Sequence, residues 1–158
     1  MTDAQPLPPP PPNPPPPTTP YRDARVGELT PQWRLVMVVT WAMVFLSYMA
    51  MWKASEELGI GTWWLGPRSN PQPTVVSLIP FVIIVLVGGA ASFNIRYLPW
   101  IGIAGSLALT LIAIPDLSRS VGLAVVEFAI AGAAMIVSLT SLTGVYRRPP
   151  GTAAEPGR

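Results

Sequence analysis

Hydrophobic residues in this chain gather in four blocks, with polar or proline-rich segments between them. The blocks cover residues 33–52, 74–93, 98–115 and 121–145. Each is close to the length that an α-helix needs to cross roughly 30 Å of hydrocarbon. The last three blocks are joined by short connections, which require neighbouring helices to run antiparallel. The pattern predicts an all-α membrane protein, with a four-transmembrane-helix bundle over residues 33–148.

The segments on either side of this bundle are polar. Eleven of the 21 prolines lie in Met1–Pro20, and a proline run lacks backbone N–H donors and fixes φ, which predicts an extended or disordered tail. This tail is either a ligand for a proline-binding cytoplasmic partner or a solvated spacer. Residues 21–32 form a charged juxtamembrane segment, and residues 149–158 are predicted to be a short disordered tail.

Tryptophan, glycine and proline indicate where the predicted helices begin, end and bend. Trp33 and Trp52 stand at the two ends of the first block, as expected of rings at the level of the lipid headgroups. Gly59 and Gly61 are predicted to end the first helix beyond the membrane. Pro80 removes one backbone hydrogen bond, so we expect the second helix to bend near one end.

The ten basic residues indicate the orientation of the chain. With four spans both termini lie on one side of the membrane, and that side carries seven of these residues against three on the other. The seven are Arg22, Arg25, Arg34, Arg96, Arg147, Arg148 and Arg158, and the three are Lys53, Arg68 and Arg119. The positive-inside rule then predicts a multi-pass protein of the plasma (inner) membrane with both termini cytoplasmic.

Composition excludes several classes of function. The chain contains no cysteine and no histidine, which excludes thiolate nucleophiles, His-based acid–base catalysis and the usual zinc and haem sites. A net charge of +2 is too small to indicate nucleic-acid binding. We therefore expect neither catalysis nor a cofactor nor a metal site.

Glu127 is the only charged residue that lies well inside a predicted span. Steps of three and four residues from Glu127 give a seam of small or polar residues along one side of the fourth helix. The seam consists of Ala124, Glu127, Ala131, Ala134, Ser138 and Ser141. Such a seam favours close packing against other helices, and helical rise places Glu127 about 9 Å from the start of its span.

Other predicted spans bring polar side chains to a similar depth. They are Ser47, Tyr48, Ser77 and Thr110, and we expect them to form a buried polar cluster around the carboxyl group of Glu127. One interpretation is the proton- or cation-binding site of a small transporter, acting as a homo-oligomer because four short helices enclose little pathway. The alternative is a hydrogen-bonded acid that fixes helix register, or one that extends towards Arg119 or Arg68.

The connections between the predicted spans carry charged and tryptophan residues. Asp116 and Arg119, three residues apart, are expected to form an ion pair at the membrane surface. In the longest connection, Trp63, Trp64 and Arg68 are either a contact surface for a partner or simple interfacial anchors.

The sequence TWWLGPRSNPQP of this connection, with the proline tail and the four spans, resembles small four-span integral membrane proteins of actinobacteria that have no characterised activity. The resemblance implies no activity for this chain. Our first hypothesis is a non-catalytic accessory or scaffolding subunit of a larger membrane complex with other membrane protein subunits. The small-residue edges of the third and fourth spans would supply packing, and the proline tail or the tryptophan loop would contact the partners. The alternatives are the transporter that uses Glu127 and a membrane anchor for the proline tail.

Overall fold

The computed structural model describes residues 26–67, 69–93 and 95–146. The two predicted tails and residues 21–25 lie outside these ranges, and so does Arg68.

All regular secondary structure in the described residues is helical, apart from one bridge that pairs Leu29 with Val145. The α-helices are α1 (Pro31–Leu58), α2 (Thr74–Ser77), α3 (Ile79–Ser92), α4 (Leu98–Ala113) and α5 (Val121–Ser141). Two short 3₁₀ helices, η1 (Ile114–Ser118) and η2 (Leu142–Gly144), extend α4 and α5. The predicted all-α class is confirmed.

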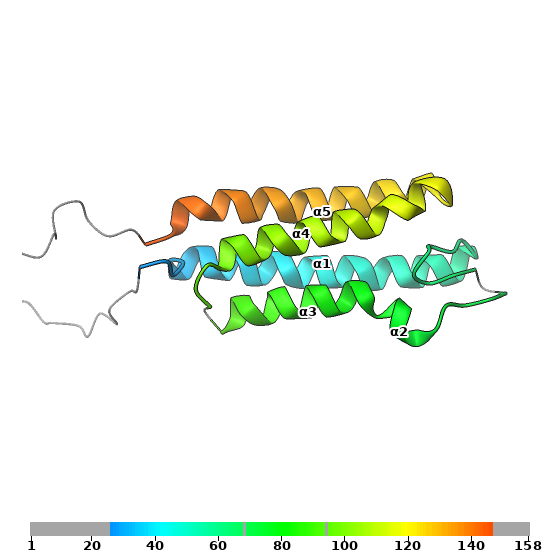
Figure 1. Cartoon of the computed structure of the whole chain (residues 1–158), viewed down its shortest axis with the longest axis horizontal. Coiled ribbons are helices and arrows are strands. Elements are labelled where there is room, and N and C mark those ends of the chain that lie inside the picture. Colours follow the sequence, from blue (N-terminus) through cyan, green and yellow to red (C-terminus); the bar gives the residue numbers. More distant parts are fainter. Residues whose placement is uncertain (1–25, 68, 94, 147–158) are drawn as a thin grey trace, which may run out of the picture.

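The four longer helices lie side by side in a ring (Figure 1). Helix α1 packs against α3 and α5, and α4 packs against the same two helices. The start of α1 and the end of α5 lie at one end of the bundle, and the loop Gly59–Pro73 lies at the other end, beside η1. We call this segment the α1–α2 loop.

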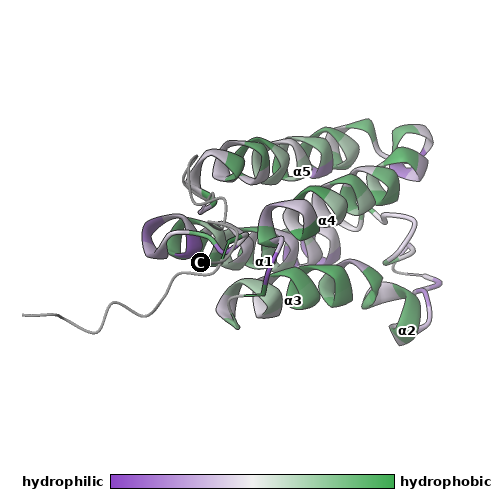
Figure 2. Cartoon of the chain, turned by 60° about the vertical axis from the view of Figure 1, so that its left-hand side comes forward, coloured by the Kyte–Doolittle hydropathy of each residue, from purple (hydrophilic) through white to green (hydrophobic). Residues whose placement is uncertain are grey.

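Three of the four predicted spans are long and apolar enough to cross a membrane: Pro31–Leu58, Leu98–Ser118 and Val121–Gly144. Helix α3 is apolar but shorter, with 14 residues. The helices consist largely of apolar residues, which are green in Figure 2. Large examples that are exposed include Leu35, Met43, Val85, Leu86, Leu107 and Ile136. Surfaces of this kind are stable in contact with lipid and costly in contact with water.

The second predicted helix is not continuous, because it is divided into α2 and α3 at Leu78. Pro80 follows two residues later and has no N–H to donate to the carbonyl group of Val76, and its ring disfavours helical geometry at the residue before it. The predicted bend near one end of this helix is therefore confirmed, in the form of a break.

The predicted end of the first helix is also confirmed. Helix α1 continues beyond Trp52 to Leu58, and Gly59 follows in the left-handed conformation with φ of 69°. Glycine adopts this conformation without steric cost, which is why it ends helices so often.

All six residues of the predicted α5 seam are buried. Because α5 packs against α1 and α4, the seam faces the interior of this bundle. The small side chains let the helices approach closely, as expected for helices in lipid.

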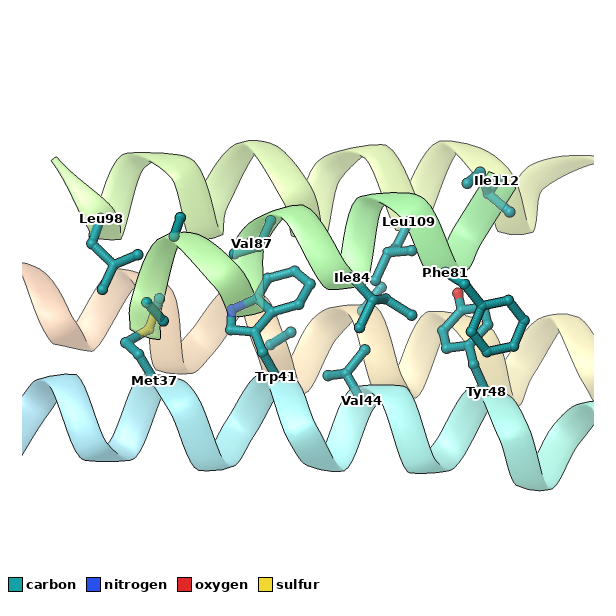
Figure 3. Packing of buried hydrophobic residues seen from close by; sticks show 14 of the residues in the cluster. Met37, Trp41, Val44, Tyr48, Phe81, Ile84, Val87, Leu98, Leu109 and Ile112 are labelled. Carbon is teal, nitrogen blue, oxygen red and sulfur yellow. The ribbon is translucent and has the colours of Figure 1, made fainter. Parts of the chain in front are cut away.

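Large side chains of α1 pack against glycines of α4 in the centre of the bundle. Figure 3 shows Met37 and Trp41 extending from α1 between the opposite helices. A Cβ atom at Gly105 would lie 2.6 Å from Cγ2 of Val87 and 2.9 Å from Cη2 of Trp41. Both distances are shorter than van der Waals contact, so the Trp41 ring is accommodated only because position 105 carries no side chain.

We predict that Gly105→Ala lowers the free energy of unfolding in detergent by about 1–3 kcal/mol, the usual cost of adding a methyl group to a packed core. Chemical denaturation followed by circular dichroism measures it. Gly132→Ala is the control, since a Cβ atom at Gly132 meets nothing within 4 Å. Equal stability of the two variants would contradict the packing described here.

Candidate functional site

Glu127 is fully buried in the second turn of α5. Its Oε1 atom accepts a hydrogen bond of 2.9 Å from Nε1 of Trp64, which belongs to the α1–α2 loop. Its Oε2 atom receives no N–H or O–H donor from the described residues. A carboxyl group without water around it needs such donors or a proton, and Glu127 has one donor.

A second carboxyl group, that of Asp116, is fully buried at the same end of the bundle. Its Oδ1 atom accepts a hydrogen bond of 2.7 Å from the backbone N–H of Trp63, and its Oδ2 atom receives no donor from the described residues. The predicted surface ion pair with Arg119 is wrong: Arg119 is exposed, and no ion pair joins it to Asp116 in the described part of the chain. Because η1 continues α4 by one tighter turn, position 116 faces the bundle and the loop supplies its donor.

The carboxyl groups of Asp116 and Glu127 lie close enough for their charges to act on each other, although no hydrogen bond joins them in the described part of the chain. Two neighbouring negative charges repel each other strongly in a site from which water is excluded. The site therefore favours the state in which one of the two carboxyl groups carries a proton. We call Asp116 and Glu127 the carboxyl pair.

Tyr48 of α1 completes the site. Its ring is fully buried, its hydroxyl group has no hydrogen-bond partner among the described residues, and the charges of both carboxyl groups act on it. Figure 3 shows its hydroxyl oxygen at the far end of the ring, away from the α1 backbone. Helices α1, η1 and α5 thus each supply one buried oxygen atom that receives no donor from the described residues: Oη of Tyr48, Oδ2 of Asp116 and Oε2 of Glu127.

The α1–α2 loop is fixed on this site by further hydrogen bonds. Nε1 of Trp63 donates to the carbonyl oxygen of Ile112 at 2.6 Å, and Oγ of Ser77 donates to that of Trp64 at 3.0 Å. The Trp64 ring lies among other aromatic rings, with centroids 6.0 Å from Tyr48, 6.0 Å from Phe81 and 6.3 Å from Trp52. Edge-to-face and tilted contacts of this kind stabilise the packing beyond the area that they bury.

Both interpretations of the loop tryptophans require exposed rings, but Trp64 is fully buried and Trp63 is half-buried. The physical reason is that the indole N–H of Trp64 has a buried acceptor in Glu127. The third residue of the proposed partner contact, Arg68, lies outside the described residues.

The structure brings together some of the residues predicted to surround Glu127. Tyr48 lies beside the carboxyl pair, and Ser77 is joined to it through Trp64. Ser47 and Thr110 instead donate to carbonyl oxygens four residues earlier in their own helices. No hydrogen bond in the described part of the chain links either of these two to the carboxyl pair.

The sequence did not predict that Asp116 and Trp64 lie beside Glu127. The place of Asp116 could have been found from the helical hairpin, because positions 116 and 127 flank the turn between α4 and α5 and therefore come to the same end of two antiparallel helices. Trp64 carries no comparable signal, because interfacial anchoring explains a loop tryptophan equally well.

Comparisons of the chain with protein-family models, curated proteins and solved structures found no match. The resemblance of the α1–α2 loop to actinobacterial membrane proteins therefore stays a prediction, and the assignment of function rests on the geometry of the site.

We predict that Asp116→Ala releases the α1–α2 loop. It removes the acceptor of the Trp63 amide and leaves a buried donor unsatisfied, at a cost of about 1.5–3 kcal/mol for a hydrogen bond to a charged group. Hydrogen exchange followed by mass spectrometry should show faster exchange across residues 60–72.

Asp116→Asn is the matched control for the loss of the hydrogen bond from the Trp63 amide. The asparagine side-chain oxygen still accepts from Trp63, and the neutral amide group removes the charge beside Glu127. Exchange in the loop should stay slow in Asp116→Asn, and equally fast exchange in both variants would show that the loop is not held by this bond.

Proposed function

We propose that this chain is a non-catalytic integral membrane protein that binds a proton at the carboxyl pair and couples it to the movement of an ion or solute across the membrane. The observation that supports the proposal is the burial of two neighbouring carboxyl groups, each with one oxygen atom that receives no donor from the described residues. Ionisable groups inside membrane helices are expensive to bury and belong most often to ion pathways. Because Asp116 lies beside Glu127, a proton-binding site explains the two acids better than a single acid that only fixes helix register.

The same geometry implies how such a protein would work. Asp116 and Glu127 are closed off by the α1–α2 loop, so a proton reaches them only when Trp63 and Trp64 move or when the carboxyl pair is approached from between the helices. Loss of the proton leaves two adjacent negative charges, and their repulsion favours a state in which the loop has moved away. Since one four-helix chain encloses little pathway, we expect a homo-oligomer in which the pathway lies between copies.

The orientation of the site follows from the distribution of basic residues. The carboxyl pair lies at the loop end of the bundle, because its donors belong to the α1–α2 loop, and the start of α1 and the end of α5 lie at the opposite end (Figure 1). If the positive-inside rule holds for this chain, with both termini cytoplasmic in the plasma (inner) membrane, the carboxyl pair lies towards the extracytoplasmic side.

The test is proton flux into vesicles that contain the purified chain, measured with a trapped pH-sensitive dye after a pH jump. The wild-type chain should conduct protons, and Glu127→Gln and Asp116→Asn should reduce the flux to that of empty vesicles, because neither amide releases a proton at neutral pH. Glu57→Gln is the control, since Glu57 is exposed and pairs with Lys53 at 3.6 Å. Wild-type flux in folded Glu127→Gln would contradict the proposal.

A second candidate is the accessory or scaffolding subunit of a larger membrane complex. It is favoured by glycines on outward faces: Cβ atoms built at Gly89 of α3 and at Gly122 and Gly132 of α5 meet nothing within 4 Å. A helix of another subunit could approach the backbone closely at these positions. This candidate predicts a co-purifying membrane protein in mild detergent, and recovery of the lone chain would remove its support.

A further inference from the structure

The hydroxyl group of Tyr48 is not used in the closed site. The side chain is fully buried, and its Oη atom has no hydrogen-bond partner among the described residues. A buried hydroxyl group without a partner costs free energy, and such groups are rare in folded proteins. The closed site therefore carries a cost at Tyr48 that the contacts of the described residues do not offset.

The surroundings of this hydroxyl group relate it to Glu127. The charge of Glu127 acts on Tyr48 more strongly than that of Asp116. Oε1 of Glu127 accepts from the indole N–H of Trp64, and Oε2 receives no donor from the described residues. A donor without an acceptor thus lies near a carboxyl group that has a single donor.

The Tyr48 ring also packs against the indole ring that supplies this donor. The ring centroids of Tyr48 and Trp64 are 6.0 Å apart, at an interplanar angle of 39°. Tyr48 belongs to α1, whereas Trp64 belongs to the α1–α2 loop. When the loop moves away, Tyr48 stays in the bundle and loses the neighbour that occupies the space beside its ring.

Movement of the loop removes the hydrogen bond that Glu127 receives from Trp64. The α5 face that carries Glu127 is turned to the interior of the bundle, so the carboxyl group still lies between helices after the loop has moved. A carboxylate in that position needs another donor. The phenol O–H of Tyr48 is such a donor, and hydrogen bonds to ionised acceptors are stronger than those between neutral groups.

We propose that Tyr48 is a reserve donor for the carboxyl pair: its hydroxyl group bonds to Glu127 when Trp64 leaves, and this bond makes opening of the α1–α2 loop less costly. The proposal rests on the function proposed above, because the carboxyl pair exchanges its proton when the loop opens. Tyr48 acts through Glu127 and is therefore a positioning residue.

Loop opening is measured with a single introduced cysteine, since the chain contains none. Leu65→Cys places a thiol at a half-buried position of the loop. The rate at which this thiol reacts with a water-soluble maleimide, in the full chain in nanodiscs at neutral pH, reports how often the loop opens. Glu57→Cys, at an exposed position of α1, gives the rate of an unprotected thiol.

Tyr48→Phe keeps the ring and removes the hydroxyl group. It should slow the labelling of Leu65→Cys by about tenfold or more, the effect of losing a hydrogen bond to a charged group, and leave the labelling of Glu57→Cys unchanged. Tyr97→Phe is the matched control, since Tyr97 lies at the other end of the bundle beside Gly27, and should leave both rates unchanged. An unchanged rate in Tyr48→Phe would overturn the proposal.

A double-mutant cycle with Glu127→Gln tests whether the hydroxyl group acts through Glu127. Removal of an unsatisfied hydroxyl group also stabilises the closed site by itself, and that effect does not depend on the charge of residue 127. A reserve donor acts on a carboxylate, so Tyr48→Phe should slow labelling about fivefold more in the Leu65→Cys chain than in the same chain with Glu127→Gln. An equal effect in the two chains would overturn the proposal.

The labelling cycle and the proton flux of the vesicles distinguish the two proposals. Coupling between Tyr48 and Glu127 in a chain that conducts no protons would support the reserve donor and contradict the proposed transport. Proton flux in a chain without this coupling would contradict the reserve donor alone.

Discussion

The burial of two neighbouring carboxyl groups is the constraint on which the loop end of this molecule depends. Removing Asp116 and Glu127 from water is costly, and each carboxyl group recovers part of that cost from a single N–H donor of the α1–α2 loop. The donors come from Trp63 and Trp64, so the loop can leave the bundle only by exposing or abandoning the carboxyl pair. The connection between two helices is thereby made part of the protein interior. A proton between the two acids reduces the repulsion that would otherwise oppose this arrangement.

The remainder of the bundle is stabilised by small residues that let the helices approach closely and by large side chains such as Met37 and Trp41 that fill the interior. The seam of α5 lies wholly in the interior, and Gly105 of α4 accommodates the Trp41 ring. These surfaces are therefore used within one chain, and a partner subunit would have to bind elsewhere, such as the outward glycines of α3 and α5. The same pattern explains why the fold tolerates a broken second helix: α3 is held by packing against α1 and α4, and the backbone groups freed near Pro80 lie at the loop end.

The parts of the structure that follow from periodicity were predictable from the sequence. Apolar block length predicts the helices, Gly59 predicts the end of α1, and steps from Glu127 predict the six buried residues of α5. The carboxyl pair was not predictable in this way. Asp116 lies outside the apolar blocks, where a surface position is the ordinary expectation, and its burial depends on η1 turning the side chain inward. Ser47 and Thr110 have the expected depth along their helices, but their hydroxyl groups bond to their own backbones, and depth alone does not specify the direction of a side chain.

The most direct test of this account is infrared spectroscopy of the chain in lipid, which distinguishes a protonated carboxyl group from a carboxylate by its C=O stretching band. We predict one protonated-carboxyl band at neutral pH that shifts slowly in heavy water, because the carboxyl pair is closed off from solvent, and that disappears in both Asp116→Asn and Glu127→Gln. A wild-type spectrum without this band, or a band that persists in both variants, would contradict the shared proton.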